Sequence, residues 1–516
     1  MHNVAIPILL AIPLLGCLTV FALPAAEEKL IKIVTLVTSL IALVYSVVLA
    51  VAFNTNGARF QFLGSWPWIT ALGTRLSFGM DGIAVVLVVM AALLVPAVVI
   101  ASWNTVDSDD DSEESTASDR SVKGFFGLIL LLEVFMLGVF AAMDVFLFYV
   151  FFEAMLVPMY FIIGMFGGPR RQYAAMKFFL YSLLGGLLML AAVIGLYVVA
   201  GKSTFSFTAL IGSVPDGASQ KLLFLGFFIA FAIKAPLVPF HTWLPDAGAE
   251  APFGGAALLV GVLDKVGTFG FLRYCLPLFP GASRFFSKPI LVLCVIGVLY
   301  AAFLAMGQRD MKRLVAYTSI AHFGFIGLGV FAFTTQSGTG AVFYMFNHGL
   351  STGALFLVVG FLIMRGKSRQ ITDYGGTSKV TPRLGGAFLL AGLSALALPG
   401  MSTFISEFLV LVGTFTRHKG FAIVATAGIV LAALYVLLLY QRAMQGAVSD
   451  KVRKFRDLSW RETLAVGPLL AVIIVLGIYP KPMLDIINPA VKATMSDVGK
   501  TDPAPAAHLA NPGDGK

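Results

Sequence analysis

The stretch KLLFLGFFIAFAIKAPLVPF, residues 221–240, combines the two features that decide the fold. From Leu222 to Ile233 it contains only apolar residues and glycine. Twenty helical residues at 1.5 Å each cross the roughly 30 Å hydrocarbon core of a bilayer. Lys234 and Pro236 then interrupt the segment, and a lysine at that depth costs roughly 2.5–3.5 kcal/mol on insertion scales. The stretch predicts a membrane-spanning helix that is broken beside a charge.

Similar apolar segments recur along the chain, which is 58% hydrophobic and only 12% charged. Soluble domains contain about 25% charged residues, so a bilayer must cover this apolar surface. We predict an all-α polytopic membrane protein with about 14 transmembrane helices. The predicted spans are 4–23, 30–53, 80–103, 122–142, 145–167, 173–200, 221–240, 253–276, 289–306, 313–333, 340–364, 383–413, 420–442 and 462–480.

A weak internal repeat divides the chain. Residues 122–280 contain five predicted helices with a break at Pro236, and residues 281–443 contain five more with a break at Pro399. An odd number of helices gives the two sets opposite topology, and paired broken helices in inverted repeats indicate an ion site near the midplane. Residues 1–121 then form three N-terminal helices plus an acidic loop. Residues 444–516 form a basic loop, a last helix and a polar C-terminal tail.

Orientation follows from lysine and arginine, which gather in the loops on one side of the predicted helices. Basic loops face the cytoplasm, so both termini are expected on the outer face of a bacterial cytoplasmic membrane. Residues 107–119, rich in Asp, Glu and Ser, predict a solvated linker. The tail after Lys481, rich in Ala, Pro and Gly, predicts a poorly ordered outer end.

Several function classes are excluded. The net charge of +9 is spread over loops and helix ends rather than forming a nucleic-acid-binding face. No Walker loop or GxGxxG motif occurs, and the cysteines lack the spacing of iron–sulfur or zinc ligands. No basic segment precedes the first apolar run, so we expect a retained helix there rather than a signal peptide. Cofactors are expected only on partner chains. The three cysteines are Cys17, Cys275 and Cys294.

Charged residues inside predicted helices are the candidate functional residues. Lys234 and Lys265 are the basic ones, and an ammonium can release its proton when burial or a moving carboxylate changes its environment. Arginine could not do so, because its guanidinium stays protonated. These residues therefore suggest a proton relay, and static ion pairs between helices are the alternative. The acidic candidates are Glu133, Glu153, Asp264 and Glu407.

Two prolines mark the expected breaks. Pro236 removes an N–H donor and should leave the carbonyl of Ala232 without its helical partner, and Pro239 should do the same to Ala235. Pro399 should free the carbonyl of Ala395 in the second repeat. Freed carbonyls can hold water beside Lys234, and a simple packing kink is the alternative.

Three histidines complete the candidate set. His322 follows Thr318 and Ser319 on one helix face, and His348 shares a face with Tyr344, Ser351 and Thr352. Histidine titrates near neutral pH, so both are candidate relays, with a hydrogen-bonded core histidine as the alternative. His241 lies at the end of the broken helix and is a candidate gate.

Four motifs resemble the subunit M family of bacterial NADH:quinone oxidoreductase, respiratory complex I. The resemblance extends from the third predicted helix to the last. Its most specific parts are the run from Phe151 to Tyr160 and the Lys-Ala-Pro motif at 234–236. The others are His-Thr-Trp-Leu-Pro-Asp-Ala at 241–247 and the segment from Leu398 to Phe408, which antiporter-like subunits share.

The resemblance implies fourteen helices with two inverted five-helix repeats and a translocase subunit that moves protons and water. Family roles would make Glu153 the modulating acid, Lys234 its partner, Lys265 the central relay and Glu407 the terminal group. The family's histidines on the tenth and eleventh helices match His322 and His348. NADH, FMN, iron–sulfur clusters and quinone would be bound by partner subunits, which include two further antiporter-like subunits. The long in-plane helix of the distal subunit is not expected.

The sequence departs from the family at two places. The usual Ala-His-Thr-Glu-Ala-Pro is Ala-Gly-Ala-Glu-Ala-Pro at 247–252, and Asp264 replaces an apolar residue before Lys265. Three other functions share features with this sequence. They are an Mrp-type cation/proton antiporter subunit, a membrane subunit of an energy-converting hydrogenase, and a non-catalytic scaffold.

Overall fold

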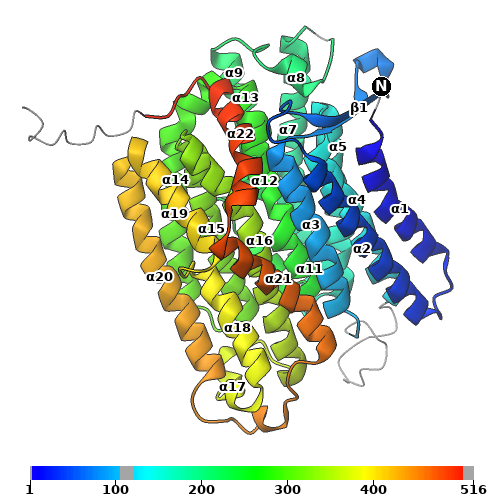
Figure 1. Ribbon diagram of the computed structural model, residues 1–516, viewed down its shortest axis with the longest axis vertical. Coiled ribbons are helices and arrows are strands. Elements are labelled where there is room, and N and C mark those ends of the chain that lie inside the picture. The colour runs from blue at the N-terminus through cyan, green and yellow to red at the C-terminus, as the bar shows by residue number, and fades with distance from the viewer. Residues whose placement is uncertain (1–2, 105–120, 202, 504–516) are drawn as a thin grey trace, which may run out of the picture.

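A computed structural model describes residues 3–104, 121–201 and 203–503. Figure 1 shows helices lying side by side along the long axis of the molecule, with short elements at both ends. Twelve described helical segments are long and apolar enough to cross a membrane. The predicted helical membrane fold is confirmed, whereas the count of fourteen and the inverted repeats stay predictions. The acidic segment 107–119 lies outside the described residues.

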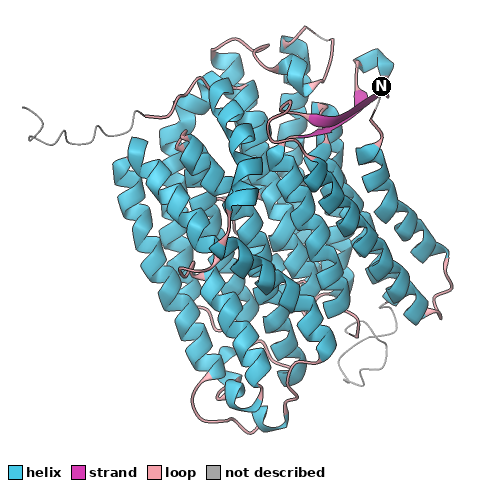
Figure 2. Cartoon of the chain, in the orientation of Figure 1, coloured by secondary structure: helices cyan, strands magenta, loops and turns pink. Residues whose placement is uncertain are grey.

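The first half of the chain contains the only two strands that the structure describes (Figure 2). They pair antiparallel, with Trp66 opposite Leu76. Asp144 accepts hydrogen bonds from the N–H groups of Phe146 and Leu147, which starts a new helix three residues after the previous one ends. The elements are α1 Ala5–Ala22, α2 Glu28–Ala52, β1 Gln61–Pro67, η1 Thr70–Leu72, β2 Arg75–Met80, α3 Gly82–Ala101, α4 Val122–Ala141, α5 Val145–Ala154, α6 Leu156–Phe166, α7 Arg171–Val199, α8 Phe207–Leu210, α9 Ala218–Lys234 and α10 Leu244–Glu250.

The second half begins with one long buried helix that contains two π-helical turns, η3 and η4. The elements are α11 Phe253–Leu258, η3 Leu259–Leu263, α12 Asp264–Gly270, η4 Phe271–Cys275, α13 Leu276–Leu278, α14 Pro280–Met306, α15 Met311–Phe331, α16 Thr335–Gly366, η5 Ile371–Asp373, α17 Thr377–Val380, α18 Pro382–Ala395, α19 Ser402–Arg417, α20 Lys419–Met444, η6 Val452–Lys454, α21 Trp460–Ile478 and α22 Lys481–Asp497.

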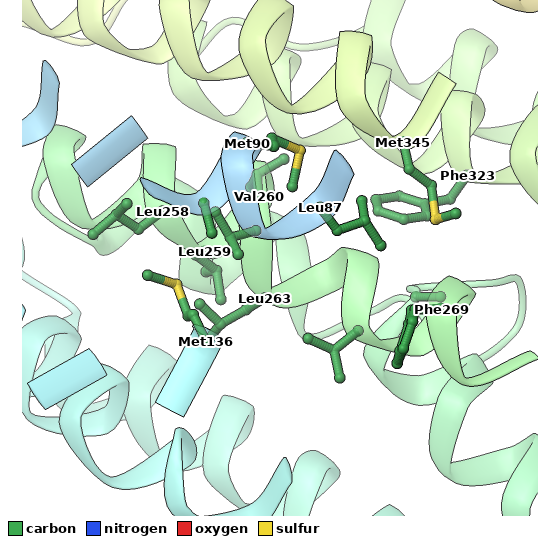
Figure 3. Close-up of a cluster of buried hydrophobic side chains, with 14 of the residues drawn as sticks. Leu87, Met90, Met136, Leu258, Leu259, Val260, Leu263, Phe269, Phe323 and Met345 are labelled. Atoms are coloured by element: carbon green, nitrogen blue, oxygen red, sulfur yellow. The ribbon is translucent and has the colours of Figure 1, made fainter. Parts of the chain in front are cut away.

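The segment Phe253–Leu278 lies at the centre of the bundle, and every residue of its most apolar window is buried. Side chains from several helices surround it in Figure 3, among them Met90 of α3, Met136 of α4, Phe323 of α15 and Met345 of α16. A helix that is buried all round has no lipid-facing side. Any charge on this segment must therefore find its partners inside the protein.

The C-terminal region corrects one prediction. Instead of a poorly ordered tail after Lys481, the chain forms α22, which buries Ile487, Val491 and Met495 against the bundle. These apolar residues are four apart and so share one helix face. Prolines 482 and 489 made the segment resemble a coil, but Pro482 stands at the second helical position, where no N–H donor is needed.

A further difference concerns α14, which begins at Pro280 rather than near residue 289. Its first turns carry serines whose hydroxyls bond within the protein. Ser283 donates to the carbonyl of Cys275, and Ser287 donates to the carbonyl of Phe331. A hydropathy pattern misses these turns because their polar side chains form hydrogen bonds inside the protein and do not contribute apolar surface for lipid.

The loop before α21 is fixed by one carboxylate. Asp457 accepts hydrogen bonds from the backbone N–H groups of Arg383 and Leu384 at the start of α18, both at 2.9 Å, and from that of Leu458 at 2.8 Å. Burial would raise the pKa of the Asp457 carboxyl, but these three donors hold it below the ordinary value. The charged form of Asp457 therefore ties this loop to α18.

Candidate functional site

The first candidate group joins α5, α7 and α9. Glu153 lies near the end of α5 with its carboxylate against Gly186 of α7, where an added Cβ would stand 1.7 Å from Oε1. Lys234 is the last residue of α9, and its Nζ lies 5.0 Å from the ring centroid of Phe152 and 5.7 Å from that of Phe178. Neither Oε1 of Glu153 nor Nζ of Lys234 has a hydrogen-bond partner among the described residues. Two aromatic rings therefore lie beside the Lys234 ammonium, and no hydrogen bond joins it to Oε1 of Glu153.

The break after Lys234 differs in detail from the prediction. The carbonyl of Ala232 is not free, because it accepts a 2.9 Å hydrogen bond from the N–H of Leu237. The carbonyl of Ile233 accepts from the indole Nε1–H of Trp243, also at 2.9 Å. The helix does end beside Pro236 as expected. The chain itself satisfies these two carbonyls, so water is not needed at either of them.

The second break lies between α18 and α19, around Pro399. The N–H groups of Ala397 and Leu398 bond to the carbonyls of Ser394 and Leu393, which closes the end of α18. Thr403 of α19 donates to the carbonyl of Ser394 at 2.6 Å and holds the two halves together. Both broken helices therefore occur where the prolines predicted them.

Lys265 occupies the centre of the molecule and is fully buried. Its Nζ lies 2.7 Å from Nδ1 of His348 on α16 and donates to the carbonyl of Val260 in η3. In a regular α-helix the carbonyl of Val260 would accept the N–H of residue 264, so the π-helical turn helps to make this acceptor accessible. The sequence predicted both residues, and the structure brings them into direct contact.

The chain of polar groups continues from His348 toward α19. The rings of His348 and His322 lie 5.2 Å apart, and Nδ1 of His322 lies 2.5 Å from the hydroxyl of Tyr344. Glu407 is buried on α19, and its Oε1 has no hydrogen-bond partner among the described residues. The two predicted histidines therefore lie in ring contact, and one of them bonds to Tyr344, a residue that the sequence placed on the His348 face without assigning it a role.

The remaining candidates stand apart from this group of polar side chains. Glu133 on α4 is fully buried, and neither carboxylate oxygen has a partner among the described residues. His241 lies in the segment between α9 and α10, with its ring 5.4 Å from that of Tyr300. Asp264 starts α12 and is also fully buried without a hydrogen-bond donor in the described part of the chain.

Ion pairs that sequence reasoning missed gather where α10 meets α7, α15 and the end of α16. Asp246 pairs with Lys177 and Arg313, each at 2.7 Å. Glu250 pairs with Arg369 at 3.1 Å. Both acids lie in or beside the family motifs, and this position is the sequence signal that could have identified them. They hold α10 against α7, α15 and the segment that follows α16, just beyond the break at Pro236.

Next to these pairs lies a cleft of about 1020 Å³. Arg171, Lys312 and Lys367 line it together with Glu250 and Arg369, and Lys312 donates to the carbonyl of Ala251. The cleft is bordered by the ends of α6, α11 and α16, at the end of the bundle that the basic loops predict to be cytoplasmic.

A second missed ion pair is buried at the opposite end of the central segment. Arg273 in η4 is 2% exposed and lies 2.6 Å from Asp81, which also caps the start of α3. The guanidinium lies 4.9 Å from the ring of Phe60 and 5.1 Å from that of Phe269. The sequence placed Arg273 at a helix end, and no periodic signal linked it to a residue almost 200 positions earlier.

Comparisons with known proteins agree with this geometry. The family described as NADH:quinone oxidoreductase/Mrp antiporter, transmembrane region, matches residues 142–432. The chain is 48% identical to NADH-quinone oxidoreductase subunit M of Mycobacterium tuberculosis H37Rv, over 98% of this chain and 97% of that protein. It is 37% identical to NADH-ubiquinone oxidoreductase chain 4 of Arabidopsis thaliana, over 94% and 95% of the two chains.

Solved structures show the same fold. A chain of respiratory complex I from Thermus thermophilus with bound NADH matches with a TM-score of 0.86 and 30% identity, over 97% of this chain and all of that one. A chain of the Mrp complex from Dietzia sp. matches with a TM-score of 0.82 over 95% and 98% of the two chains, and its 20% identity shows likeness of fold alone. The chain therefore belongs to the NADH:quinone oxidoreductase/Mrp antiporter family, and within it to the relatives named subunit M.

Proposed function

We propose that this chain is the proton-translocating membrane subunit of a respiratory NADH:quinone oxidoreductase in a bacterial cytoplasmic membrane. Protons move along Glu153, Lys234, Lys265, the two histidines and Glu407, driven by quinone reduction on other subunits. The observation that carries the proposal is the contact of Lys265 with His348, continued through His322 and Tyr344. Buried ionisable groups in membrane helices mark ion pathways, because static packing has less costly solutions.

The residues suit proton transfer in a specific way. An amine and an imidazole can each hold or release one proton, and a short N···N contact allows the proton to pass between them. The 2.7 Å distance between Nζ of Lys265 and Nδ1 of His348 meets that requirement. The gap between Glu153 and Lys234 has no such contact, so we place the regulated step there. Secondary roles belong to Glu133, His241, Asp264, Pro236 and Pro399.

Lys234→Ala tests the proposal directly. In membrane vesicles energised with NADH, the variant should lose most acid transport while the assembled complex stays abundant. Lys234→Arg should lose it as well, because a guanidinium cannot hand on its proton. Lys454→Ala, which removes an exposed basic residue, is the matched control and should transport normally. Near-normal transport in both Lys234 variants would overturn the proposal.

An Mrp-type cation/proton antiporter subunit is the second candidate function, because the matching family includes such antiporters and the Mrp fold is similar. The two functions differ in their partners. Native purification followed by mass spectrometry should recover peripheral subunits that carry iron–sulfur clusters if the first proposal is correct. Sodium-dependent transport by a complex without such subunits would favour the antiporter, and copurifying hydrogenase subunits would favour an energy-converting hydrogenase.

A further inference from the structure

Asp264 is the one buried acid on the central segment, and its surroundings are unusual. It is fully buried at the first position of α12, directly after the π-helical turn η3. Neither carboxylate oxygen has a hydrogen-bond donor among the described residues. A buried carboxylate without partners is expensive, so a static packing role does not account for an aspartate here.

One face of α12 packs on the end of α9. A Cβ added to Gly267 would lie 2.4 Å from the carbonyl oxygen of Phe231 and 2.6 Å from the nitrogen of Ala235. One turn later, the ring of Phe271 lies 6.0 Å from that of Phe231. Residues three and seven apart share a helix face, so Asp264 lies on the face that Gly267 and Phe271 press against α9. The nearest charged residue on that end of α9 is Lys234, next to Ala235.

The neighbouring face of α12 points to α16. Nζ of Lys265 lies 2.7 Å from Nδ1 of His348 on α16. Adjacent helical residues point about 100° apart. Asp264 and Lys265 therefore occupy the same turn but face different groups, with Lys234 on one side and the histidine chain on the other.

We propose that Asp264 is a proton-carrying residue that connects Lys234 with Lys265. The inference rests on the proposed function, because it assigns the step between two groups of that relay. The Lys234 ammonium gives one proton to the Asp264 carboxylate, which leaves a neutral amine and a carboxylic acid. The acid then gives that proton to the neutral amine of Lys265 and returns to the carboxylate. One N–H bond breaks and one forms, and the net charge of the three groups is unchanged.

The electrostatics of the site support this step. A carboxylate and an ammonium attract each other strongly in a low-dielectric interior, so a charged Asp264 favours the ammonium form of a lysine beside it. Asp264 lies on the same turn as Lys265 and on the face of α12 that packs against the end of α9, so its carboxylate can act as an intermediate acceptor between the two lysines. A carboxylate between them stabilises each ammonium in turn. It thereby connects the α5–α9 group to the α12–α16 group.

The test uses the whole purified complex in proteoliposomes, with NADH oxidation and acid transport measured together. Asp264→Asn keeps the size of the side chain but cannot carry the proton, and it should lower the rate of NADH-driven acid transport by about 100-fold or more. Asp264→Glu keeps the carboxylate and should retain measurable transport. Thr268→Val on the same helix removes a buried hydroxyl outside the relay and should transport normally.

The outcomes separate the two proposals. One outcome is that Lys234→Ala abolishes transport while Asp264→Asn transports within about twofold of the parent, which is well below the effect expected for a proton-transfer group. The Asp264 inference is then overturned and the proposed function stands. If both variants transport normally, the proposed function fails first. A difference infrared spectrum of the parent during turnover should show a carboxylic-acid C=O band that is absent in Asp264→Asn. Absence of such a band in the parent would overturn the proton-carrying role. If Asp264→Asn does not assemble, Asp264→Glu replaces it in this measurement, and the band is expected at a shifted frequency in that variant.

Discussion

Gly186 makes room for the Glu153 carboxylate, and adding one methyl group there tests whether the position of that acid matters. In Gly186→Ala the new Cβ would lie 1.7 Å from Oε1 and 2.4 Å from Cδ of Glu153, whereas real Cβ contacts essentially never fall below 3.0 Å. The carboxylate must therefore retreat by about 1.3 Å, and a misplacement of about 1 Å at a reacting group can cost about 100-fold in rate. The collision involves the end of a side chain, so the loss of stability should stay within about 1–3 kcal/mol.

We expect Gly186→Ala to assemble normally and to lower NADH-driven acid transport by one to two orders of magnitude, that is about 10- to 100-fold. Gly195→Ala, on the same helix as Gly186, is the matched control. Its new Cβ would lie 2.7 Å from a methyl group of Leu223, which is also the end of a flexible side chain. It should assemble and transport like the parent. Equal transport by both variants would refute the reasoning, since a displaced carboxylate would then have no effect on the relay.

Three further predictions concern charges. Glu153→Gln should abolish acid transport per assembled complex while Glu153→Asp is partly tolerated, and loss of subunit abundance alone would indicate a bracing role. Arg273→Ala leaves Asp81 buried and unpaired, so the free energy of unfolding in detergent should fall by about 3–5 kcal/mol. The control Arg284→Ala removes an exposed ion pair and should lower that free energy by less than about 1 kcal/mol. Because the pKa of Asp457 is lowered from 3.8, its stabilisation is present above that pH and lost as pH falls below it. The melting temperatures of the parent and Asp457→Asn should therefore converge only under strongly acidic conditions.

The parts of the fold that hydropathy controls could be predicted from the sequence. Apolar length located the spanning segments, and Pro236 and Pro399 located both breaks, because a missing N–H has the same local effect in any context. The contact of Lys265 with His348 was indicated only by residue type, since 83 positions separate them. Nothing in a single sequence specifies which turn of one helix meets which turn of another.

The missed features share a physical cause. Tyr344 bonds to His322, and Gly186 accommodates Glu153, yet both are ordinary residues in membrane helices and become distinctive only through contacts across the bundle. Regular helical bonding predicts a free carbonyl at Ala232, because Pro236 has no N–H to donate. The chain instead turned tightly enough for Leu237 to reach it.

The position of α22 has a consequence for how this protein is made. A Cβ on Gly82 would stand 1.9 Å from the carbonyl oxygen of Ile486, and Thr339 donates to Asn488 at 2.7 Å, so α22 contacts the starts of both α3 and α16. The ribosome synthesises α22 after every other described helix (Figure 1). Until then, the starts of α3 and α16 lack the contacts that α22 makes with them. Insertion therefore ends with a step that joins the earliest and the later helices, and a nascent chain stalled before residue 481 would remain open at that end.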